Sequence, residues 1–249
     1  MQNERLHRAM TAAHLDVQEV SEATGVDAKT VQRWLKGRVP HARHRWTIAK
    51  LVKEDEHYLW PGVDGQRIPG SPATAEVIAA YPHRAEVPPE RWWSLLVDAK
   101  RQVDLLAYAM LFLPEAHPRL FDLLRGKAAA GGTVRIAMVD PASRELADRD
   151  AEEGLDGGLV ARVRTSIHYF AEGLGNCEGI ELRVYAAPLY NSLFRFDDEM
   201  FVTPHLYATT GYRAPLLHLR RLGNDGVFDT FAGHFEALWA TTKPAKAAA

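Results

Sequence analysis

The sequence predicts a small all-α domain followed by a larger α/β domain. Residues 3–53 show short helical periodicities separated by capping residues and glycines, whereas residues 90–241 alternate helical patterns with apolar, strand-like runs. The stretch between them is dense in glycine and proline and lacks apolar periodicity, which is typical of a linker. We therefore expect domains over residues 1–60 and 76–245, joined by a linker over residues 61–75.

The second helix of the first domain has clear start and stop signals. Asp16 and Glu19 have the spacing of a capping box, in which each side chain satisfies the other residue's backbone amide. Gly25 can adopt the left-handed conformation that ends a helix, so the helix is expected between Asp16 and Gly25. A first helix over residues 3–13 precedes it, and Val20 and Ala23 are expected on one face.

The third helix has two distinct faces. Asp27 is its expected cap, the helix spans residues 28–36, and Gly37 ends it. Its apolar stripe holds Val31, Trp34 and Leu35, and its polar stripe holds Ala28, Lys29, Gln32, Arg33 and Lys36. A fourth helix after residue 40 is expected to add Trp46, Ile48, Ala49, Leu51 and Val52 to the same core.

The second domain is predicted to alternate helices with strands. The apolar run over residues 103–113 is typical of a strand buried on both faces. Further strands are expected over 133–139, 180–186, 192–196, 200–203 and 216–219, with helices over 90–100, 120–130, 159–174 and 228–241. An acidic loop is expected after residue 139 and an alanine-rich tail after residue 241. This order predicts an α/β sandwich.

Charge is distributed unevenly along the chain. The net charge is −2, yet the segment 28–53 contains no acidic residue and eight basic ones: Lys29, Arg33, Lys36, Arg38, Arg43, Arg45, Lys50 and Lys53. A basic block of this kind is expected of a surface that binds a polyanion, because phosphate contacts supply most non-specific affinity for nucleic acids. A solvated helix face is the alternative interpretation of charge alone.

The stretch from Gln18 to Gly37, QEVSEATGVDAKTVQRWLKG, resembles the helix-turn-helix of Xre/Cro-family transcription regulators. The resemblance covers about sixty residues. It implies that the third helix enters the major groove of double-stranded DNA. The arginine bias, 22 of 30 basic residues, is typical of a GC-rich genome and with this resemblance implies a bacterial, actinobacterial source. A helix-turn-helix can also bind protein instead of DNA.

The resemblance implies two groups of DNA contacts. Arg33 and Lys29 are expected to donate to guanine, and Gln32 to pair with adenine. Phosphate contacts fix position without reading sequence. The candidate base readers are Ala28, Lys29, Thr30, Gln32 and Arg33, and the candidate phosphate contacts are Gln18, Lys36, Arg38, Arg43 and His44.

The second domain resembles one half of a phospholipase-D-like fold. That superfamily carries an H-x-K-x4-D motif followed by G-S-x-N. Here Tyr190 stands in place of the histidine and Ser192 in place of the lysine, and only Asp197 is retained; Pro204-His205-Leu206-Tyr207 stands in place of G-S-x-N. A phenol is a poor substitute for the nucleophilic imidazole, so we expect no catalysis by this route.

The same residues are candidates for a non-catalytic pocket. The resemblance places Tyr190, Ser192, Asp197, His205 and Tyr207 at the carboxyl ends of the central strands, with Tyr212 and Arg213 as further members. Hydroxyls, an imidazole and charges suit a small polar ligand. A purely structural role for these residues is the alternative. No HxxxH or CxxC spacing is present, so no metal site and no cofactor are predicted.

These observations predict a DNA-binding transcription regulator whose second domain is not an enzyme. Because the chain holds one phospholipase-D-like half, we expect a homodimer that reads a near-palindromic operator with half-sites about 34 Å apart or a multiple of that distance. One alternative is a phosphodiesterase or nuclease rebuilt from His205 and Asp197. Another is a second domain that only dimerises or binds partners. A site with Tyr190 and His205 buried against each other would favour that scaffold.

The sequence also carries expectations about location. The longest apolar run, residues 105–113, is nine residues long, whereas a membrane-spanning helix needs about 20. The first eight residues, MQNERLHR, lack the apolar stretch of a secretory signal. The single cysteine, Cys177, cannot form an internal disulfide. We therefore expect a cytoplasmic protein that does not contact membranes.

Overall fold

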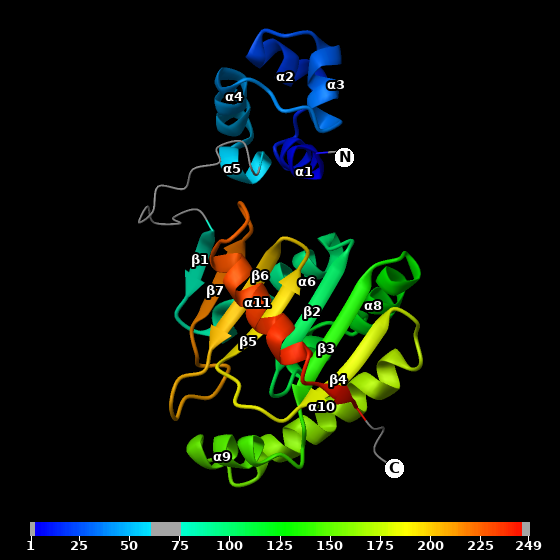
Figure 1. Ribbon diagram of the computed structural model, residues 1–249, viewed down its shortest axis with the longest axis vertical. Helices are drawn as coiled ribbons and strands as arrows, with labels where there is room; N and C mark the ends of the chain where they lie inside the picture. The colour runs from blue at the N-terminus through cyan, green and yellow to red at the C-terminus, as the bar shows by residue number, and fades with distance from the viewer. Residues whose placement is uncertain (1–2, 61–75, 246–249) are drawn as a thin grey trace. The chain divides into compact units, whose positions relative to one another are not determined.

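The computed structural model describes residues 3–60 and 76–245 (Figure 1). The chain divides into two compact units, Met1–Glu76 with Arg221–Gly226, and Val77–Arg220 with Val227–Ala249. The expected linker, residues 61–75, lies outside the described residues. The predicted fold class, an all-α part followed by an α/β part, is confirmed.

The described part of the first unit consists of helices around a small apolar core. Leu6, Val20, Val31, Ile48 and Leu59 are fully buried and come from five different helices. In chain order, the helices are α1 (Glu4–Ala12), α2 (Val17–Thr24), α3 (Ala28–Leu35), α4 (Ala42–Val52) and α5 (Glu56–Leu59). The first four lie where the sequence predicts them, and α5 was not predicted.

The ends of α2 and α3 are fixed by the residues that the sequence analysis singled out. Asp16 accepts a hydrogen bond from the Glu19 amide at 2.8 Å, and Glu19 accepts one from the Asp16 amide at 2.7 Å. Gly25 follows α2 in the left-handed conformation, with φ of 67°. Asp27 accepts from the Thr30 amide at 2.8 Å and so caps α3. The predicted capping box and both caps are confirmed.

Two residues of the first unit lie elsewhere than the sequence predicts: Trp46, which was expected in the core, and Ala23, which was expected on one face of α2 with Val20. Trp46 is 62% exposed, and its ring packs against the Lys50 ammonium group, 5.1 Å from the ring centroid. Ala23 is exposed as well, and Ser21 takes its place beside Val20 on the buried side of α2. Arg45 fills the inner face of α4 near Trp46, because an ion pair with Glu56 allows its charge to be buried.

The second unit is built on an eight-stranded mixed sheet. Its strand order is β1-β7-β6-β5-β2-β3-β4-β8. β3 runs parallel to its two neighbours, β2 and β4, and every other pair of neighbouring strands is antiparallel. The strands are β1 (Val77–Tyr81), β2 (Gln102–Ala107), β3 (Thr133–Val139), β4 (Ile180–Tyr185), β5 (Asn191–Phe196), β6 (Glu199–Pro204), β7 (Leu216–Arg220) and β8 (Lys243–Pro244).

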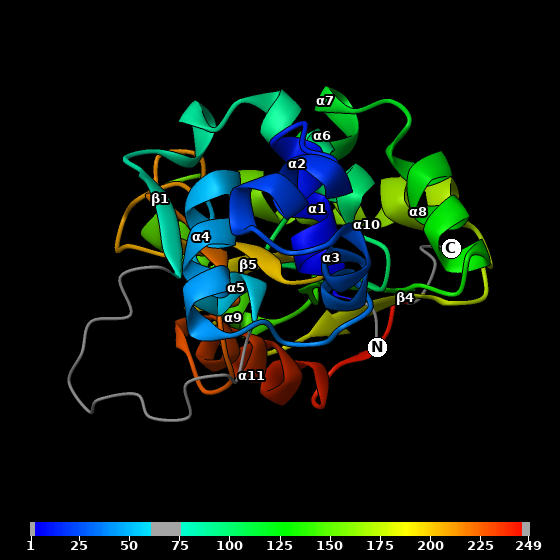
Figure 2. The same cartoon turned by 90° about the horizontal axis from the view of Figure 1, so that it is seen from above.

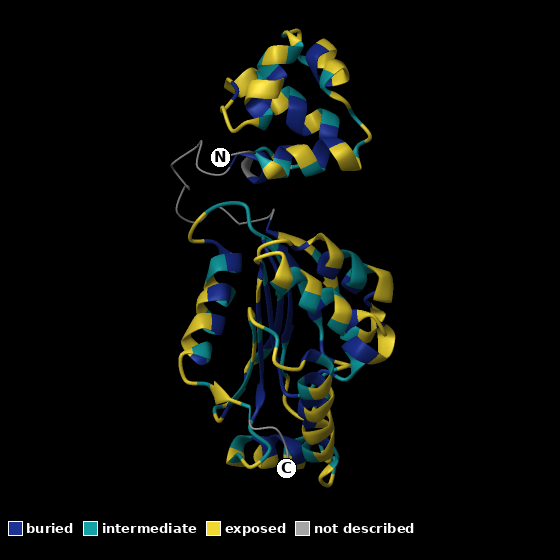
Figure 3. Cartoon of the chain, turned by 90° about the vertical axis from the view of Figure 1, so that its right-hand side faces the viewer, coloured by how far each residue is buried: buried dark blue, intermediate teal, exposed yellow. Residues whose placement is uncertain are grey.

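Helices cover both faces of this sheet. Figure 2 shows α11 (Val227–Trp239) on one side of the sheet and α6 (Pro89–Asp98), α7 (Phe112–Ala116) and α8 (Leu120–Ala129) on the other. The helix α10 (Gly158–Leu174) packs beside α8 against β3 and β4. Trp92 on α6 contacts Phe112, Phe194 and Phe201 edge to face. The central strands β2, β3, β5, β6 and β7 between these layers are largely buried (Figure 3).

The described structure corrects three expectations for the second unit. The apolar run 103–113 is not one strand, because β2 ends at Ala107 and the rest leads into α7; an apolar run alone does not distinguish a strand from a buried helix. The expected acidic loop contains α9 (Arg144–Glu152), in which Ser143 accepts a hydrogen bond from the Leu146 amide. The expected tail begins with β8, which pairs with β4.

Candidate functional site

The outer face of α3 carries basic and amide side chains. Lys29, Gln32, Arg33 and Lys36 are exposed, and Val31 on the opposite face is fully buried. Within residues 3–60, no carboxylate forms an ion pair with any of these three cations. The candidate base readers therefore share one accessible surface, which suits contact with an anionic partner.

Two of the predicted contacts already have partners within the described structure. The Thr30 hydroxyl donates to the Asp27 carboxylate at 3.0 Å, and Thr30 is half-buried, as is Ala28. The Gln18 amide donates to Glu22 at 3.3 Å across one turn of α2. These bonds fix both side chains at the beginning of their helices.

The flanking phosphate candidates lie near the beginning of α4. Arg38 and Arg43 are exposed. The Arg43 Nε donates to the His44 Nε2 at 3.1 Å. Burial and the nearby charges of Arg43 and His41 lower the pKa of His44, which keeps its imidazole neutral and able to accept this bond. His44 therefore holds the Arg43 guanidinium in place.

Arg45 belongs to the basic block but not to its exposed surface. Its Nε donates to Glu56 at 2.6 Å, and its Nη1 donates to the Pro40 carbonyl at 3.1 Å. Arg45 therefore joins α4 to α5 and is not available to a ligand.

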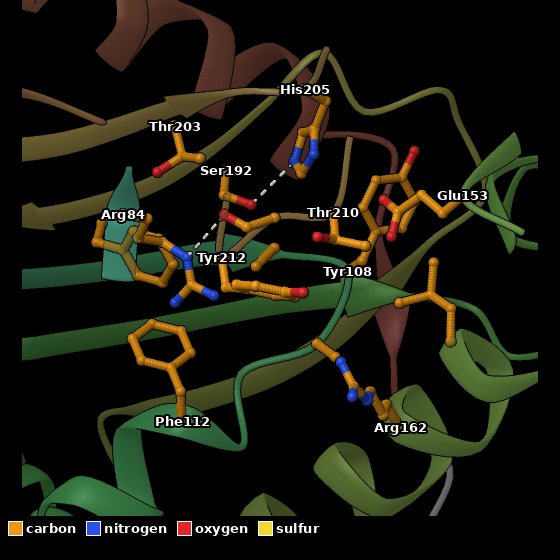
Figure 4. A pocket seen from close by; sticks show the side chains of 15 residues that line it. Arg84, Tyr108, Phe112, Glu153, Arg162, Ser192, Thr203, His205, Thr210 and Tyr212 are labelled. Carbon is orange, nitrogen blue, oxygen red and sulfur yellow. Dashed lines mark hydrogen bonds between the residues drawn. The ribbon is translucent and has the colours of Figure 1, made fainter. Parts of the chain in front are cut away.

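The second unit contains a cavity of about 90 Å³ at the end of β2 (Figure 4). It lies between the sheet and the helices α7 and α10, which contribute Phe112 and Arg162. On the sheet side it is lined by Ser192 and Thr203, which are paired across β5 and β6 and so point to the same face. Ser192 and the His205 Nε2 are hydrogen-bonded at 3.0 Å.

Arg84 lies in the wall of this cavity and is half-buried. Its Nε donates to the Gly211 carbonyl at 3.1 Å, and its guanidinium carbon lies 4.0 Å from the centroid of the Phe112 ring. Removal from water lowers the pKa of Arg84 to about 10. No carboxylate in the described ranges pairs with it.

His205 is kept neutral in this wall. Burial, followed by the charges of Arg149 and Arg84, lowers its pKa to about 3. Its Nδ1 is buried and has no hydrogen-bond partner among the described residues, and the same holds for the hydroxyls of Thr203 and Thr210. The cavity thus gathers three polar atoms that the described protein leaves unsatisfied.

The structure brings only part of the predicted ligand set together. Ser192 and His205 line the cavity, and so does Tyr212. Tyr190 and Tyr207 are 71% and 85% exposed and lie with His205 at a wider depression on the outside of the unit. Tyr190 and His205 are therefore not buried against each other.

Asp197 lies far from this group, which corrects the prediction. Ser192 is near the beginning of β5 and Asp197 follows its last residue, so roughly 16 Å of strand separates them. The Asp197 carboxylate is 2% exposed and accepts hydrogen bonds from the backbone amides of Lys100, Arg101 and Gln102. A site rebuilt from His205 and Asp197 is therefore not formed in this unit.

Neither a metal site nor a membrane span is found in the described ranges. No group of three or more histidines, cysteines or carboxylates among residues 3–60 and 76–245 is placed to hold a metal ion. In the same part of the chain, no helix combines the length and apolar character needed to cross a bilayer.

A comparison with protein families matches residues 73–246 to the model described as a domain of unknown function, DUF5919. This match covers more than half of the chain. The chain belongs to the DUF5919 family. The DUF5919 region contains the whole sheet and the cavity, and the helices of the first unit precede it. A search of curated proteins found no match.

Several solved structures are similar to this DUF5919 protein. TrmBL2, described as an archaeal chromatin protein with a novel mode of DNA binding, is 15% identical with a TM-score of 0.42 over 70% of this chain. The match spans 56% of TrmBL2. Nuc from Salmonella typhimurium, a phospholipase D family member, is 14% identical with a TM-score of 0.39, over 63% of this chain and 90% of Nuc. NucT from Helicobacter pylori is 10% identical with a TM-score of 0.42, over 67% of this chain and 98% of NucT.

The sequence analysis did not identify three polar residues that line the DUF5919 cavity: Arg84, Thr203 and Thr210. Arg84 lies in a short 3-10 helix, Arg84–Glu86, in a stretch where no element was expected. Thr203 had a usable signal, because antiparallel pairing of the two predicted strands places it opposite Ser192. Thr210 lies in the loop between β6 and β7, where no periodicity is available.

Proposed function

We propose that this DUF5919 protein is a sequence-specific DNA-binding transcription regulator of the Xre type. The observation that carries the proposal is the outer face of α3, where Lys29, Gln32, Arg33 and Lys36 are exposed without carboxylate partners in the described unit. The caps at Asp16 and Asp27 and the turn at Gly25 hold this helix beside α2. A helix presented in this way fits the major groove of B-DNA.

The roles of the candidate contacts follow from their positions. Arg33 and Lys29 are proposed to donate to guanine, and Gln32 to pair with adenine. Arg43, held by His44, is proposed to contact phosphate together with Arg38 and Lys36. The Thr30 hydroxyl is bound to Asp27, so its methyl group is the part proposed to touch a base.

The second unit is proposed to dimerise and to bind a small polar ligand without catalysis. The cavity with unsatisfied polar atoms supports ligand binding. A second unit that serves only as a scaffold would be favoured by Tyr190 and His205 buried against each other, and the exposure of Tyr190 does not support that arrangement. The separation of Asp197 from His205 supports a non-enzymatic role, because the rebuilt hydrolytic site needs both.

Binding of labelled random-sequence duplex DNA tests the first part of this proposal. Affinity is expected to fall steeply between about 50 and 200 mM salt, because phosphate contacts release counterions. Arg43→Ala is expected to reduce the slope of log affinity against log salt by about 1. The matched control is Arg164→Ala, which removes an exposed arginine from α10 of the second unit.

Fluorescence anisotropy provides the measurement. A wild-type protein that does not bind at the lowest salt, or an equal change of slope for Arg43→Ala and Arg164→Ala, would contradict the proposed surface. In that case the helix-turn-helix would be assigned to protein binding.

A further inference from the structure

The cavity at the end of β2 offers more hydrogen-bonding capacity than the described protein uses. The Thr203 and Thr210 hydroxyls and the His205 Nδ1 are buried there without a partner in the described ranges. Burying a polar atom without a hydrogen-bond partner destabilises the folded state, so such atoms are rare in native structures. Three of them around one cavity indicate a polar occupant.

Arg84 indicates the sign of that occupant's charge. Its Nε is bound to the Gly211 carbonyl, and its flat face lies on the Phe112 ring. This arrangement leaves the two terminal nitrogens, which donate in the plane of the group, without a carboxylate among the described residues. The lowered pKa of Arg84 has burial as its cause, with no anion to offset it.

The acidic residue in the cavity wall does not supply the missing charge. Glu153 accepts a hydrogen bond from the Arg149 Nε at 2.7 Å and is therefore already paired. Arg162 on α10 adds a second cation to the wall (Figure 4). Arg162 is exposed and its charge acts on Glu153, so Arg84 is the more buried of the two arginines and has no paired carboxylate among the described lining residues.

The volume limits the occupant to a small group. A single water needs about 10–15 Å³ of such space, so a cavity of about 90 Å³ holds a group of a few non-hydrogen atoms. Planar or tetrahedral oxyanions of this size match the fork of a guanidinium, which binds two oxygens at once.

We propose that this cavity binds the carboxylate or phosphate group of a small molecule, with Arg84 as its anchor and the Thr203 and Thr210 hydroxyls as further donors. The proposal deepens, and rests on, the ligand-binding role proposed above for the second unit. In the proposed complex the His205 imidazole carries its proton on Nδ1 and donates it to the oxyanion, and Nε2, 3.0 Å from the Ser192 hydroxyl, accepts from that hydroxyl.

The test uses the full chain and two classes of probe. Inorganic phosphate and small carboxylates, acetate and lactate, are titrated to about 10 mM against sodium chloride of equal ionic strength. A ligand that binds only the folded state raises the melting temperature, and the increase grows with the logarithm of its concentration above the dissociation constant. Isothermal calorimetry then gives the dissociation constant. Stabilisation by phosphate alone or by carboxylates alone supports the proposal and identifies the source of the oxyanion.

Variants locate the binding site. Arg84→Met is expected to abolish the stabilisation and to weaken binding at least about tenfold, because it removes charged hydrogen bonds. Its melting temperature without ligand is not expected to fall, since a half-buried charge without a counter-ion is removed. Thr203→Val is expected to weaken binding several-fold without loss of stability, and Thr165→Val, at an exposed position on α10, is the matched control.

Two results would overturn the proposal. One is the absence of stabilisation by either probe class beyond the chloride control. The other is stabilisation that persists in both Arg84→Met and Thr203→Val, which would place the anion elsewhere. If Arg84→Met does not fold, Thr203→Val decides alone. Oxyanion binding by a protein that does not bind DNA would refute only the regulator, and DNA binding without oxyanion binding would refute only the cavity assignment.

Discussion

The Asp197 carboxylate is buried at the turn that follows β5. It accepts from three successive backbone amides, at Lys100, Arg101 and Gln102, and Asp197 adopts φ of 54° in the turn between β5 and β6. The sequence identifies this aspartate through a motif but does not show where its side chain points. Register places it at the opposite end of β5 from Ser192, and the register depends on the whole sheet.

Replacing Asp197 is therefore expected to destabilise the second unit. Asp197→Asn keeps the shape and tolerates the left-handed backbone but loses the charge that three amides share, and we expect a loss of about 1–3 kcal/mol in the free energy of unfolding. Urea denaturation measures this change. Asp198→Asn, which breaks an ion pair with the exposed Arg101, is expected to cost less than about 1 kcal/mol. Equal losses for the two variants would contradict the structural role of Asp197.

His205 is expected to make stability depend on pH. Burial and the charges of Arg149 and Arg84 lower its pKa to about 3 in the folded state, below the ordinary value of 6.5. Between these values the unfolded chain binds the proton more tightly, so stability is full above about pH 6.5 and is lost as the pH falls toward 3. His205→Gln removes this titration, and its stability is expected to fall less steeply than that of wild type.

Chemical denaturation at several pH values between 4 and 7 provides the comparison. His168→Gln, at an exposed position on α10, is the control and should follow the wild-type curve. A His205→Gln curve parallel to wild type over this range would show that His205 is not held neutral by its surroundings.

Local sequence signals predict where the helices of the first unit begin and end, whereas tertiary packing decides where β2 ends and on which side Trp46 lies. The capping box at Asp16 and the turn at Gly25 are encoded within a few residues, and the structure confirms them. The end of β2 has no local signal in the sequence, because the apolar run continues to Leu113 while the chain turns away from the sheet at the cavity. Trp46 likewise fits a helical stripe, but its side chain lies outside the core.

The capping box gives a prediction for the first unit. Asp16→Ala removes the acceptor of the Glu19 amide, and we expect a cost of about 0.5–2 kcal/mol in the stability of that unit. Hydrogen exchange followed by mass spectrometry should report the loss in peptides from α2 and α3. Peptides from β2 and β3 serve as the internal control and should not change. Unchanged exchange in α2 would mean that the box contributes little to this helix.

At the scale of the whole molecule, the sequence predicts a helical part, a linker and an α/β part, and the described residues show both classes of structure. The DUF5919 match over residues 73–246 falls on the second of these parts. The candidate site was only partly predictable. Ser192 and His205 were found from a motif position, whereas Arg84 comes from a short 3-10 helix and Thr210 from a loop, and only the folded chain brings them to the cavity. The dimer remains a prediction of the proposed function.

Selection of bound fragments from sheared genomic DNA at about 150 mM salt shows whether α3 reads DNA sequence. We expect wild type to enrich a near-palindromic site, as a twofold dimer requires, with half-sites about 34 Å apart or a multiple of that distance. Arg33→Ala is expected to lose that enrichment, at a cost of about 1–3 kcal/mol on the selected site. Enrichment of the same fragments by wild type and Arg33→Ala, or of none by wild type, would contradict sequence reading by α3.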